Sequence, residues 1–365
     1  MTSRERVLHA FGKLPGKGDR VPLQFDLCRS LVDHFSKKLG IEADYALSYY
    51  EDLTYRISAN AIRTRLGSDC IVVGGTVADG FKAKDLGNDT SLNEFGMAMR
   101  PTELYMEVVE CPLKDCSSEE DLAAYSLPNP YAPGRFTAAE RDIKRFAKDF
   151  FVIGDVELSL FELAWHLTGM EKYLMALAME ESWIEKLNDR VEEWTTGLAL
   201  SLVSRGVDAI WLGEDLGTQN SMLISPDMWR DRFKSRYARL ITKLKAANPE
   251  IIIIFHSDGA VAPLIEDFIE LGVSVYNPVQ PNVPGSDPQE LVDKYGGKIN
   301  FFGGIDQQDL LPTGDKKAIE AEIKRRSAIL GANGGYLMAP AHIIQADVSP
   351  ETVEFLCAVA TSGGA

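Results

Sequence analysis

The chain has 365 residues, and its 38 basic and 54 acidic side chains give a net charge of −16 at pH 7. This length allows two or three ordinary domains or one large α/β barrel, and it can form a sizeable core without disulfides. Such an acidic chain is a poor candidate for a protein that binds nucleic acid or an anionic membrane surface, because neutralising phosphate requires clustered Lys and Arg.

The N-terminus and the cysteines indicate a cellular location. Residues Met1–Arg6 lack the apolar stretch of a secretory signal, and the longest aliphatic run, Ile251–Phe255, is far shorter than the roughly 20 residues of a membrane span. The five cysteines include no C-x-x-C pair. We therefore expect reduced thiols and a cytoplasmic protein without a membrane segment.

Along the chain, short aliphatic runs alternate with longer amphipathic stretches. The expected strands are Val21–Asp26, Cys70–Gly74, Phe150–Val156, Val207–Asp215, Ile251–Asp258, Val273–Val279, Ile299–Asp306 and Gly334–His342. The expected helices include Gly169–Arg205, Ser225–Ala247, Ala262–Leu271 and Asp315–Leu330. This alternation predicts an α/β fold, a single (β/α)8 TIM barrel over residues 1–365, with a doubly wound open sheet as the alternative.

The interval from residue 75 to about residue 149 is too long for one crossover between strands. Within it, Leu104–Cys111 has the pattern of a strand, and the Gly- and Asn-containing stretch Leu86–Gly96 offers turns. We expect a β-hairpin insertion after the second barrel strand, within about residues 75–130.

Polar residues close nearly every aliphatic run. In a barrel, the C-terminal ends of the strands carry the chemistry, so these residues are the candidates for a functional site. They are Asp26, Asp155, Glu157, Glu214, Asp215, His256, Asp258, Asn277, Asp306, Gln307 and His342.

Two histidines and one aspartate form the sharpest of these groups. His256 and Asp258 are two residues apart on one strand and therefore point to the same side, and His342 follows the last strand. Two imidazoles and one carboxylate suit zinc or another divalent ion with one position left open. A purely hydrogen-bonding role is the alternative, and the other three histidines, His9, His34 and His166, are expected to be structural.

A second group is formed by Glu214 and Asp215, which are followed by small and amide residues up to Asn220. Two adjacent carboxylates at a strand end, followed by small and amide residues, suit a loop that contacts the substrate, and Gln219 in this loop is a candidate for that contact. In the alternative interpretation, Asp215 caps the following turn and Glu214 is solvated. Asn277 is a further candidate substrate contact, since neighbouring prolines restrict its loop.

Read together, these strand-end motifs resemble the uroporphyrinogen decarboxylase superfamily. The resemblance extends from about residue 3 to about residue 358, and the superfamily fold is a (β/α)8 barrel. The motifs that carry it are Arg20-Val21-Pro22, Asp208-Ala209-Ile210, Glu214-Asp215, His256-Ser257-Asp258-Gly259, Phe302-Gly303-Gly304-Ile305-Asp306 and Ala339-Pro340-Ala341-His342.

The decarboxylase branch of this superfamily fits the sequence poorly. Its members have an Arg-rich stretch, M-R-Q-A-G-R-Y-L, that holds the porphyrinogen carboxylates, whereas this chain has Gln24–Leu31 there. Only Arg29 could serve in that role, and Asp26 would repel a polycarboxylate. We keep a decarboxylase-type lyase as an alternative.

The corrinoid-dependent methyltransferase branch fits better. Its methylcobamide:coenzyme M members bind zinc through H-x-C and P-G-C motifs, and this chain has His256-x-Asp258 and Pro340-Ala341-His342 at those positions. Asp and His make a harder site than two thiolates, which fits an oxygen or amine donor better than a thiol. The stretches Glu214–Gln219 and His256–Gly259 look like those of methyltransferase I components of O-demethylase systems.

This resemblance implies transfer of a methyl group from a small methylated substrate, such as an aryl methyl ether, to cob(I)alamin on a separate corrinoid protein. The partner is required because the chain lacks a D-x-H-x-x-G corrinoid motif. The metal ligands would be His256, Asp258 and His342, with Glu214 or Asp215 as proton donor and Glu214 as a candidate fourth ligand. The expected substrate contacts are Asp26, Arg29, Gln219, Asn277, Asp306 and Gln308.

Three alternatives to this function stay open: a decarboxylase, a methylcobamide:thiol methyltransferase, and a ligand sensor or assembly subunit without catalysis. The sequence does not determine the oligomeric state, and a homodimer is one option.

Overall fold

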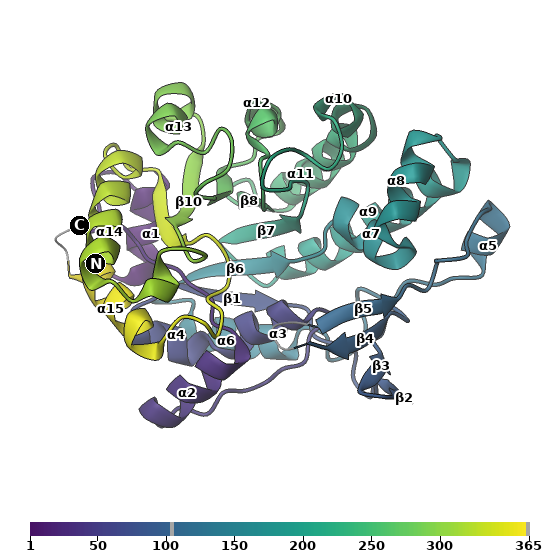
Figure 1. Cartoon of the computed structure of the whole chain (residues 1–365), viewed down its shortest axis with the longest axis horizontal. Helices are drawn as coiled ribbons and strands as arrows, with labels where there is room; N and C mark the ends of the chain where they lie inside the picture. Colours follow the sequence, from purple (N-terminus) through teal and green to yellow (C-terminus); the bar gives the residue numbers. More distant parts are fainter. Residues whose placement is uncertain (103–105, 363–365) are drawn as a thin grey trace.

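A curled parallel sheet forms the centre of the molecule. The computed structural model describes residues 1–102 and 106–362. Seven strands pair in the order β1-β6-β7-β8-β9-β10-β11, all parallel, and nearly every strand residue is buried (Figure 1). Their bounds are β1 Cys70–Gly74, β6 Phe151–Val156, β7 Ala209–Glu214, β8 Ile252–Ser257, β9 Val275–Val279, β10 Asn300–Ile305 and β11 Tyr336–Pro340.

Helices connect these strands and cover the outer face of the sheet, as Figure 1 shows. The predicted helix start at Ser225 is confirmed, since its hydroxyl accepts a hydrogen bond of 3.1 Å from the Met228 amide. The helices are α1 Ser3–Ala10, α2 Arg29–Leu39, α3 Glu51–Ser58, α4 Asn60–Leu66, α5 Glu119–Ala123, α6 Thr137–Phe146, α7 Phe161–Thr168, α8 Met170–Ala178, α9 Ser182–Val203, α10 Pro226–Trp229, α11 Ser235–Ala247, α12 Ile265–Leu271, α13 Pro288–Tyr295, α14 Lys316–Leu330 and α15 Pro350–Thr361.

The strand expected at Val21–Asp26 does not form a regular strand. Among the described residues, Leu23 forms an isolated bridge to Met338 on the last strand, and Leu27, just after the segment, forms another to Ile344 in the loop that follows that strand. Its backbone cannot form a full ladder, because Pro22 has no amide hydrogen and the Leu23 amide donates to the Asp69 carboxylate at 2.8 Å.

This segment nevertheless lies between the two ends of the sheet. The Gln24 amide donates to the Met338 carbonyl at 2.9 Å, and the Leu23 carbonyl accepts from the Asp69 amide at 2.7 Å. The fold is therefore TIM-barrel-like: within the described residues, its parallel sheet has seven regular strands, and this irregular segment takes the place of an eighth. The sequential strand order contradicts the doubly wound alternative, in which the strand order reverses.

The insertion after β1 is larger than the expected hairpin. It contains an antiparallel sheet in the order β2-β3-β4-β5, with β2 at Lys84–Gly87, β3 at Thr90–Leu92, β4 at Ala98–Pro101 and β5 at Met106–Glu110. Asn88 and Asp89 both have positive φ, 52° and 56°, which matches a tight hairpin turn between β2 and β3. Of the strand predicted at Leu104–Cys111, Leu104 and Tyr105 lie outside the described residues.

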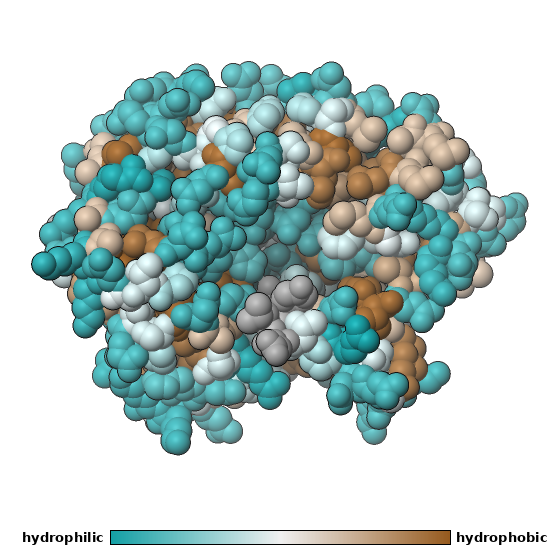
Figure 2. Space-filling model, in the orientation of Figure 1, coloured by the Kyte–Doolittle hydropathy of each residue, from teal (hydrophilic) through white to brown (hydrophobic). Residues whose placement is uncertain are grey.

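The surface is mainly hydrophilic on the face shown in Figure 2, and it is hollowed near its centre, where the arrowheads of β6 and β7 end in Figure 1. In the described ranges, no helix is long and apolar enough to cross a membrane.

Candidate functional site

Two neighbouring strands bring together the three residues best suited to hold a cation. His256 lies on β8 and Asp258 directly after it, and Asp215 directly follows β7, the strand that pairs with β8. One potential ligand atom from each of these residues lies within 4.8 Å of the others. The structure thus joins Asp215, expected to be catalytic, with two expected metal ligands.

The His256 ring is oriented by Asn277 on β9. The Nδ1 atom of His256 lies 2.6 Å from the Asn277 Oδ1 atom, and the Asn277 amide nitrogen is 3.5 Å from the Phe302 carbonyl. Because an amide oxygen only accepts hydrogen bonds, Nδ1 carries the proton in the neutral ring and Nε2 has the free lone pair. Asn277 was expected to contact the substrate; in the structure, it supports the histidine.

Two glycines allow the loops after β7 and β8 to touch. A Cβ atom on Gly217 would lie 2.7 Å from the Asp258 carbonyl oxygen, and a Cβ atom on Gly259 would clash with the Gly217 carbonyl carbon. The close approach is fixed by a hydrogen bond from the Asp258 amide to Asp215 Oδ1, 3.2 Å long. Only glycine fits at these two positions, and this contact sets the spacing of the two carboxylates.

His342 joins this group from the end of β11. Its Nε2 atom lies 3.8 Å from Asp258 Oδ2. Together with Asp258, Asp306 and Gln308, His342 lines a cavity of about 210 Å³ at the carboxyl ends of the strands. The Asp306 carboxylate also accepts hydrogen bonds from the backbone amide of Gln308 at 2.9 Å and from the side-chain amide of Asn282 at 3.1 Å. The structure therefore places two expected substrate contacts, Asp306 and Gln308, beside two expected metal ligands.

Glu214 has a different environment from its neighbour Asp215. Its carboxylate accepts hydrogen bonds from the amides of Leu160, Phe161 and Glu162 at 2.5, 3.1 and 2.8 Å and from the Tyr237 hydroxyl. These amides belong to the start of α7, where a carboxylate is favoured by the unpaired N–H groups. Burial nevertheless raises the pKa of Glu214 to about 7. Glu214 thus anchors α7 to β7.

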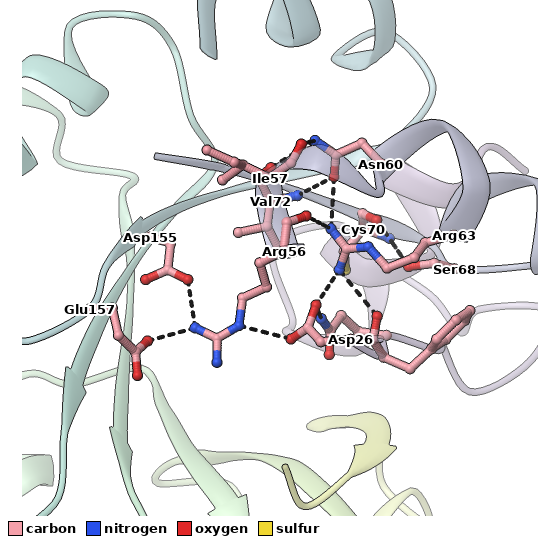
Figure 3. Close-up of polar contacts among 12 residues, drawn as sticks. Asp26, Arg56, Ile57, Asn60, Arg63, Ser68, Cys70, Val72, Asp155 and Glu157 are labelled. Carbon is pink, nitrogen blue, oxygen red and sulfur yellow. Dashed lines mark hydrogen bonds and ion pairs between the residues drawn. The ribbon is translucent and has the colours of Figure 1, made fainter. Parts of the chain in front are cut away.

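Asp26 is buried under two arginines. It pairs with Arg56 Nε at 3.1 Å and with Arg63, and Arg56 Nη1 reaches Asp155 at 2.8 Å and Glu157 at 2.6 Å (Figure 3). Figure 3 shows Arg56 extending from α3 between Asp26 and the two acidic residues of the β6 end. Asp26 shares a small cavity lining with His256, Asn277 and His342, but the two arginines already hold its carboxylate.

The acidic groups around the site strongly affect one another. Burial and the neighbouring Asp258 carboxylate raise the pKa of Asp215 to about 7. Burial alone would lower the pKa of His256, but the carboxylates of Asp258, Glu157 and Asp215 outweigh it and raise this pKa. Burial also acts on Glu157, but the Arg56 charge outweighs it and holds the Glu157 pKa below its usual value. The site is a region of negative potential in which cationic groups are stabilised.

Two expected substrate contacts lie away from this cluster. Arg29 begins α2 with 69% of its side chain exposed, and its contacts are a 3.9 Å approach to Asp33 and the Tyr45 ring. Gln219 is exposed on the loop after β7, where its Oε1 atom lies 3.5 Å from the Gln280 amide nitrogen. Gln280 in turn accepts from the Gly259 amide at 2.6 Å, so Gln219 connects to the cluster only through another side chain.

The donor set fits a divalent cation. Asp258 Oδ1 is buried and has no hydrogen-bond partner among the described residues, which indicates a position that an additional ligand can satisfy. Asp215, His256 and Asp258 offer two carboxylates and one imidazole, and His342 lies next to Asp258. This mixture of oxygen and nitrogen donors suits zinc or another borderline divalent ion.

Arg56 and Arg63, two buried arginines of this region, are not among the residues predicted from the sequence. A weak signal exists: Arg56, Asn60 and Arg63 are four and three residues apart, which is the spacing of one helical face. Asn60 indeed accepts from Arg63 at 2.8 Å and donates to Asp142 at 2.8 Å. Sequence alone could not show that this polar face is directed inward, since arginine is usually exposed.

Comparisons with known proteins agree with this architecture. The family model described as Uroporphyrinogen decarboxylase (URO-D) matches residues 91–362. A methyltransferase from Methanosarcina mazei has a similar structure, with 17% sequence identity, a TM-score of 0.71 and coverage of 99% of this chain and 98% of that chain. At this identity, the likeness demonstrates a shared fold.

More distant similarity is found to a B12-independent methionine synthase from Shewanella sp. W3-18-1, with 11% identity, a TM-score of 0.45 and coverage of 88% and 92% of the two chains. No curated protein sequence matches the chain.

Proposed function

The chain belongs to the uroporphyrinogen decarboxylase family, and on that premise we propose that it is a metal-dependent methyltransferase. It would move a methyl group from a small methylated substrate, such as an aryl methyl ether, to cob(I)alamin carried by a separate corrinoid protein. The observation that carries this proposal is the convergence of Asp215, His256 and Asp258 within 4.8 Å, beside His342.

The metal would be held by His256 and Asp258, with Asp215 and His342 as the further ligands within reach. When bound, a divalent ion supplies a Lewis acid that polarises the heteroatom bearing the methyl group. Asn277 fixes the His256 ring so that Nε2 is available, and the Gly217–Gly259 contact keeps Asp215 close to Asp258.

The other cavity residues would bind and orient the substrate. Asp306 and Gln308 border the same 210 Å³ cavity as Asp258 and His342, so they are the proposed substrate contacts. Asp215, with its pKa raised to about 7 by burial and by Asp258, is also the proposed proton donor to the leaving oxygen when it is not a ligand. Glu214 is assigned a positioning role, because four donors already occupy its carboxylate.

The charges of the site argue against a polycarboxylate substrate. A tetrapyrrole with many carboxylates requires several available cations. Arg56 and Arg63 are buried in ion pairs with Asp26, Asp155 and Glu157, and Arg29 is exposed outside the cluster. A neutral or cationic methyl donor fits this environment better than uroporphyrinogen does.

Metal binding tests the ligand assignment directly. The purified chain, reconstituted with zinc and freed of excess metal, is expected to retain about one equivalent per chain by elemental analysis. His256→Ala and Asp258→Asn are expected to lower this content strongly, whereas His34→Ala, which removes an exposed histidine on α2, is the matched control. Equal metal content in all variants, or none in the wild type, would refute the assignment.

Methyl transfer tests the activity. The zinc-loaded chain, a corrinoid protein, a reductant and a panel of methoxylated aromatics are combined, and methylation of cob(I)alamin is followed by its absorbance change. We expect methylation that is lost in His256→Ala. Decarboxylation of uroporphyrinogen by the same preparation, without methyl transfer to the corrinoid, would show that the decarboxylase alternative is correct.

A further inference from the structure

A large cavity lies at the amino-terminal end of the barrel, opposite the candidate site. Its volume is about 820 Å³, and its walls include Asn300 and Phe301 at the start of β10, Tyr336 at the start of β11, and residues of the segment after α1. Ligand cavities of soluble proteins have about 300–1,000 Å³. We call this space the amino-end cavity.

The charge of this cavity is the reverse of that of the whole chain. Four cationic side chains line it, Arg6, Lys17, Arg20 and Lys298, and Asp19 is the single acidic residue among the lining residues that the structure describes. The chain as a whole has a net charge of −16. A local excess of cations in an acidic protein concentrates anions at that place.

The two arginines that line the cavity are held in ion pairs with aspartates. Arg6 pairs with Asp19 at 2.6 Å and with Asp69 at 2.5 Å, and Arg20 pairs with Asp69 at 2.7 Å. Asp69 is fully buried and also accepts the Leu23 amide at 2.8 Å. The charges of Arg6 and Arg20 are therefore balanced by two carboxylates within the protein.

The two lysines of the cavity differ from the arginines, because their positive charges are not paired with carboxylates of the described residues. In the part of the chain that the structure describes, no carboxylate lies within ion-pair distance of Lys17 or Lys298. The Lys298 ammonium donates to the Lys294 carbonyl at 3.1 Å, which leaves its charge uncompensated. These two lysines are 281 residues apart in the sequence (298 − 17) and reach the same cavity from different loops.

The backbone of two glycines, Gly12 and Gly297, is exposed along the amino-end cavity. Gly12 and Gly297 have φ values of 67° and 78°, and a Cβ atom added at either would meet no atom within 4 Å. Phe11 and Leu14 line the same cavity and give it an apolar portion. The cavity thus combines two ammonium groups that no carboxylate of the described residues pairs with, apolar surface and exposed backbone.

We propose that the amino-end cavity binds a small phosphate-bearing organic molecule of about mononucleotide size. Lys17 and Lys298 pair with the anionic group, and the apolar wall at Phe11 and Leu14 contacts the organic part. Binding there is independent of the metal and of methyl transfer, because the candidate site lies at the other ends of the strands.

Calorimetric titration of the full-length, metal-free chain with AMP tests the proposal, with adenosine as the uncharged probe. We expect AMP to bind and adenosine to bind at least about tenfold more weakly, the factor expected for one lost charge-assisted contact. Lys17→Glu and Lys298→Glu are each expected to weaken AMP binding by at least about tenfold.

Two controls locate the binding. Lys84→Glu reverses an exposed lysine on β2, outside the cavity, and is expected to leave the AMP affinity unchanged, as is Asp258→Asn in the candidate site. Circular dichroism verifies that each variant is folded. The proposal is overturned if wild type does not bind AMP, if adenosine binds equally, or if the double variant Lys17→Glu, Lys298→Glu binds AMP like wild type.

Discussion

His166 on α7 illustrates how burial controls the charge of a single residue. Its ring stacks on Trp165 with 3.8 Å between the ring centres, and burial lowers its pKa to about 3. Its Nε2 atom is 3.5 Å from Glu162, and burial and the Asp215 carboxylate raise the pKa of Glu162 far above its usual value. His166 is therefore neutral in the folded protein, in agreement with the structural role expected from the sequence.

This lowered pKa predicts a pH-dependent loss of stability. In the unfolded chain, the pKa of His166 returns to about 6.5, so below that pH the unfolded state binds a proton that the folded state does not bind until about pH 3. Stability is thus lost as the pH falls from 6.5 towards 3. At pH 5, this contribution is about 2 kcal/mol, from 1.36 kcal/mol per pKa unit over roughly 1.5 units.

The variant His166→Gln removes this titration. Its free energy of unfolding in urea is expected to fall less than that of wild type between pH 7.5 and pH 5, by about 2 kcal/mol. His34→Gln, on the exposed side of α2, controls for the loss of a histidine elsewhere. Parallel pH curves for His166→Gln and wild type would contradict the assignment of a neutral buried ring.

Residue type and strand position predicted a substantial part of the candidate site. His256, Asp258 and Asp215 were identified because parallel strands place their carboxyl ends at one edge, which is a property of the fold. The different roles of Glu214 and Asp215 were not predictable. Adjacent residues on a strand point to opposite faces, and only the position of the α7 amides shows that Glu214 faces the helix.

Among the elements, α3, α4 and the irregular segment before α2 are joined by buried charges. Asp26 of the segment pairs with Arg56 of α3 and Arg63 of α4, and all three side chains are at most 5% exposed. Removing one partner of a buried ion pair leaves an uncompensated charge, which typically costs about 3–5 kcal/mol. The gap between β11 and β1 is thus closed by side-chain ion pairs as well as by backbone hydrogen bonds.

We predict that Asp26→Ala lowers the free energy of unfolding by about 3–5 kcal/mol, measured by urea denaturation. The matched variant is Asp33→Ala, which removes an aspartate that lies 3.9 Å from Arg29 on the surface of α2. For that exposed pair, the expected loss is below about 1 kcal/mol. Similar losses for the two variants would mean that the buried arginines do not depend on Asp26.

The elements themselves were predictable where hydrophobic burial decides them. The run Cys70–Gly74 is β1 without change, because every one of its side chains is buried in the parallel sheet. Val21–Asp26 has a similar pattern but does not form a regular strand, because Pro22 has no amide hydrogen to donate and the Leu23 amide donates to the Asp69 side chain instead of a backbone carbonyl. The number of strands in the insertion was also underestimated, because β2 is exposed along its length and has no hydrophobic pattern to detect.

For the whole molecule, the distribution of charge connects the two ends of the barrel. Carboxylates gather at the carboxyl ends of the strands, where mutual repulsion and burial raise the pKa of Asp215 to about 7 and that of Glu162 far above its usual value. The amino-end cavity has the opposite sign, with Lys17 and Lys298 unpaired by carboxylates in the described part of the chain. A divalent cation and an anionic ligand would therefore favour opposite ends of the same protein.

A divalent cation that binds the folded state at Asp215, His256 and Asp258 should also stabilise the molecule. At a free zinc concentration of about 100 times the Kd, linkage gives roughly 2.7 kcal/mol, and the unfolding entropy of a chain of this size converts that to a rise in Tm of roughly 3 °C. Differential scanning calorimetry of the metal-free protein with and without zinc measures this rise. Magnesium at the same ionic strength controls for general screening of the acidic surface.

We expect Asp258→Asn to abolish the zinc-specific part of the rise, because this variant replaces a carboxylate of the proposed donor set. An equal rise in that variant would place the stabilising ion elsewhere on the acidic surface.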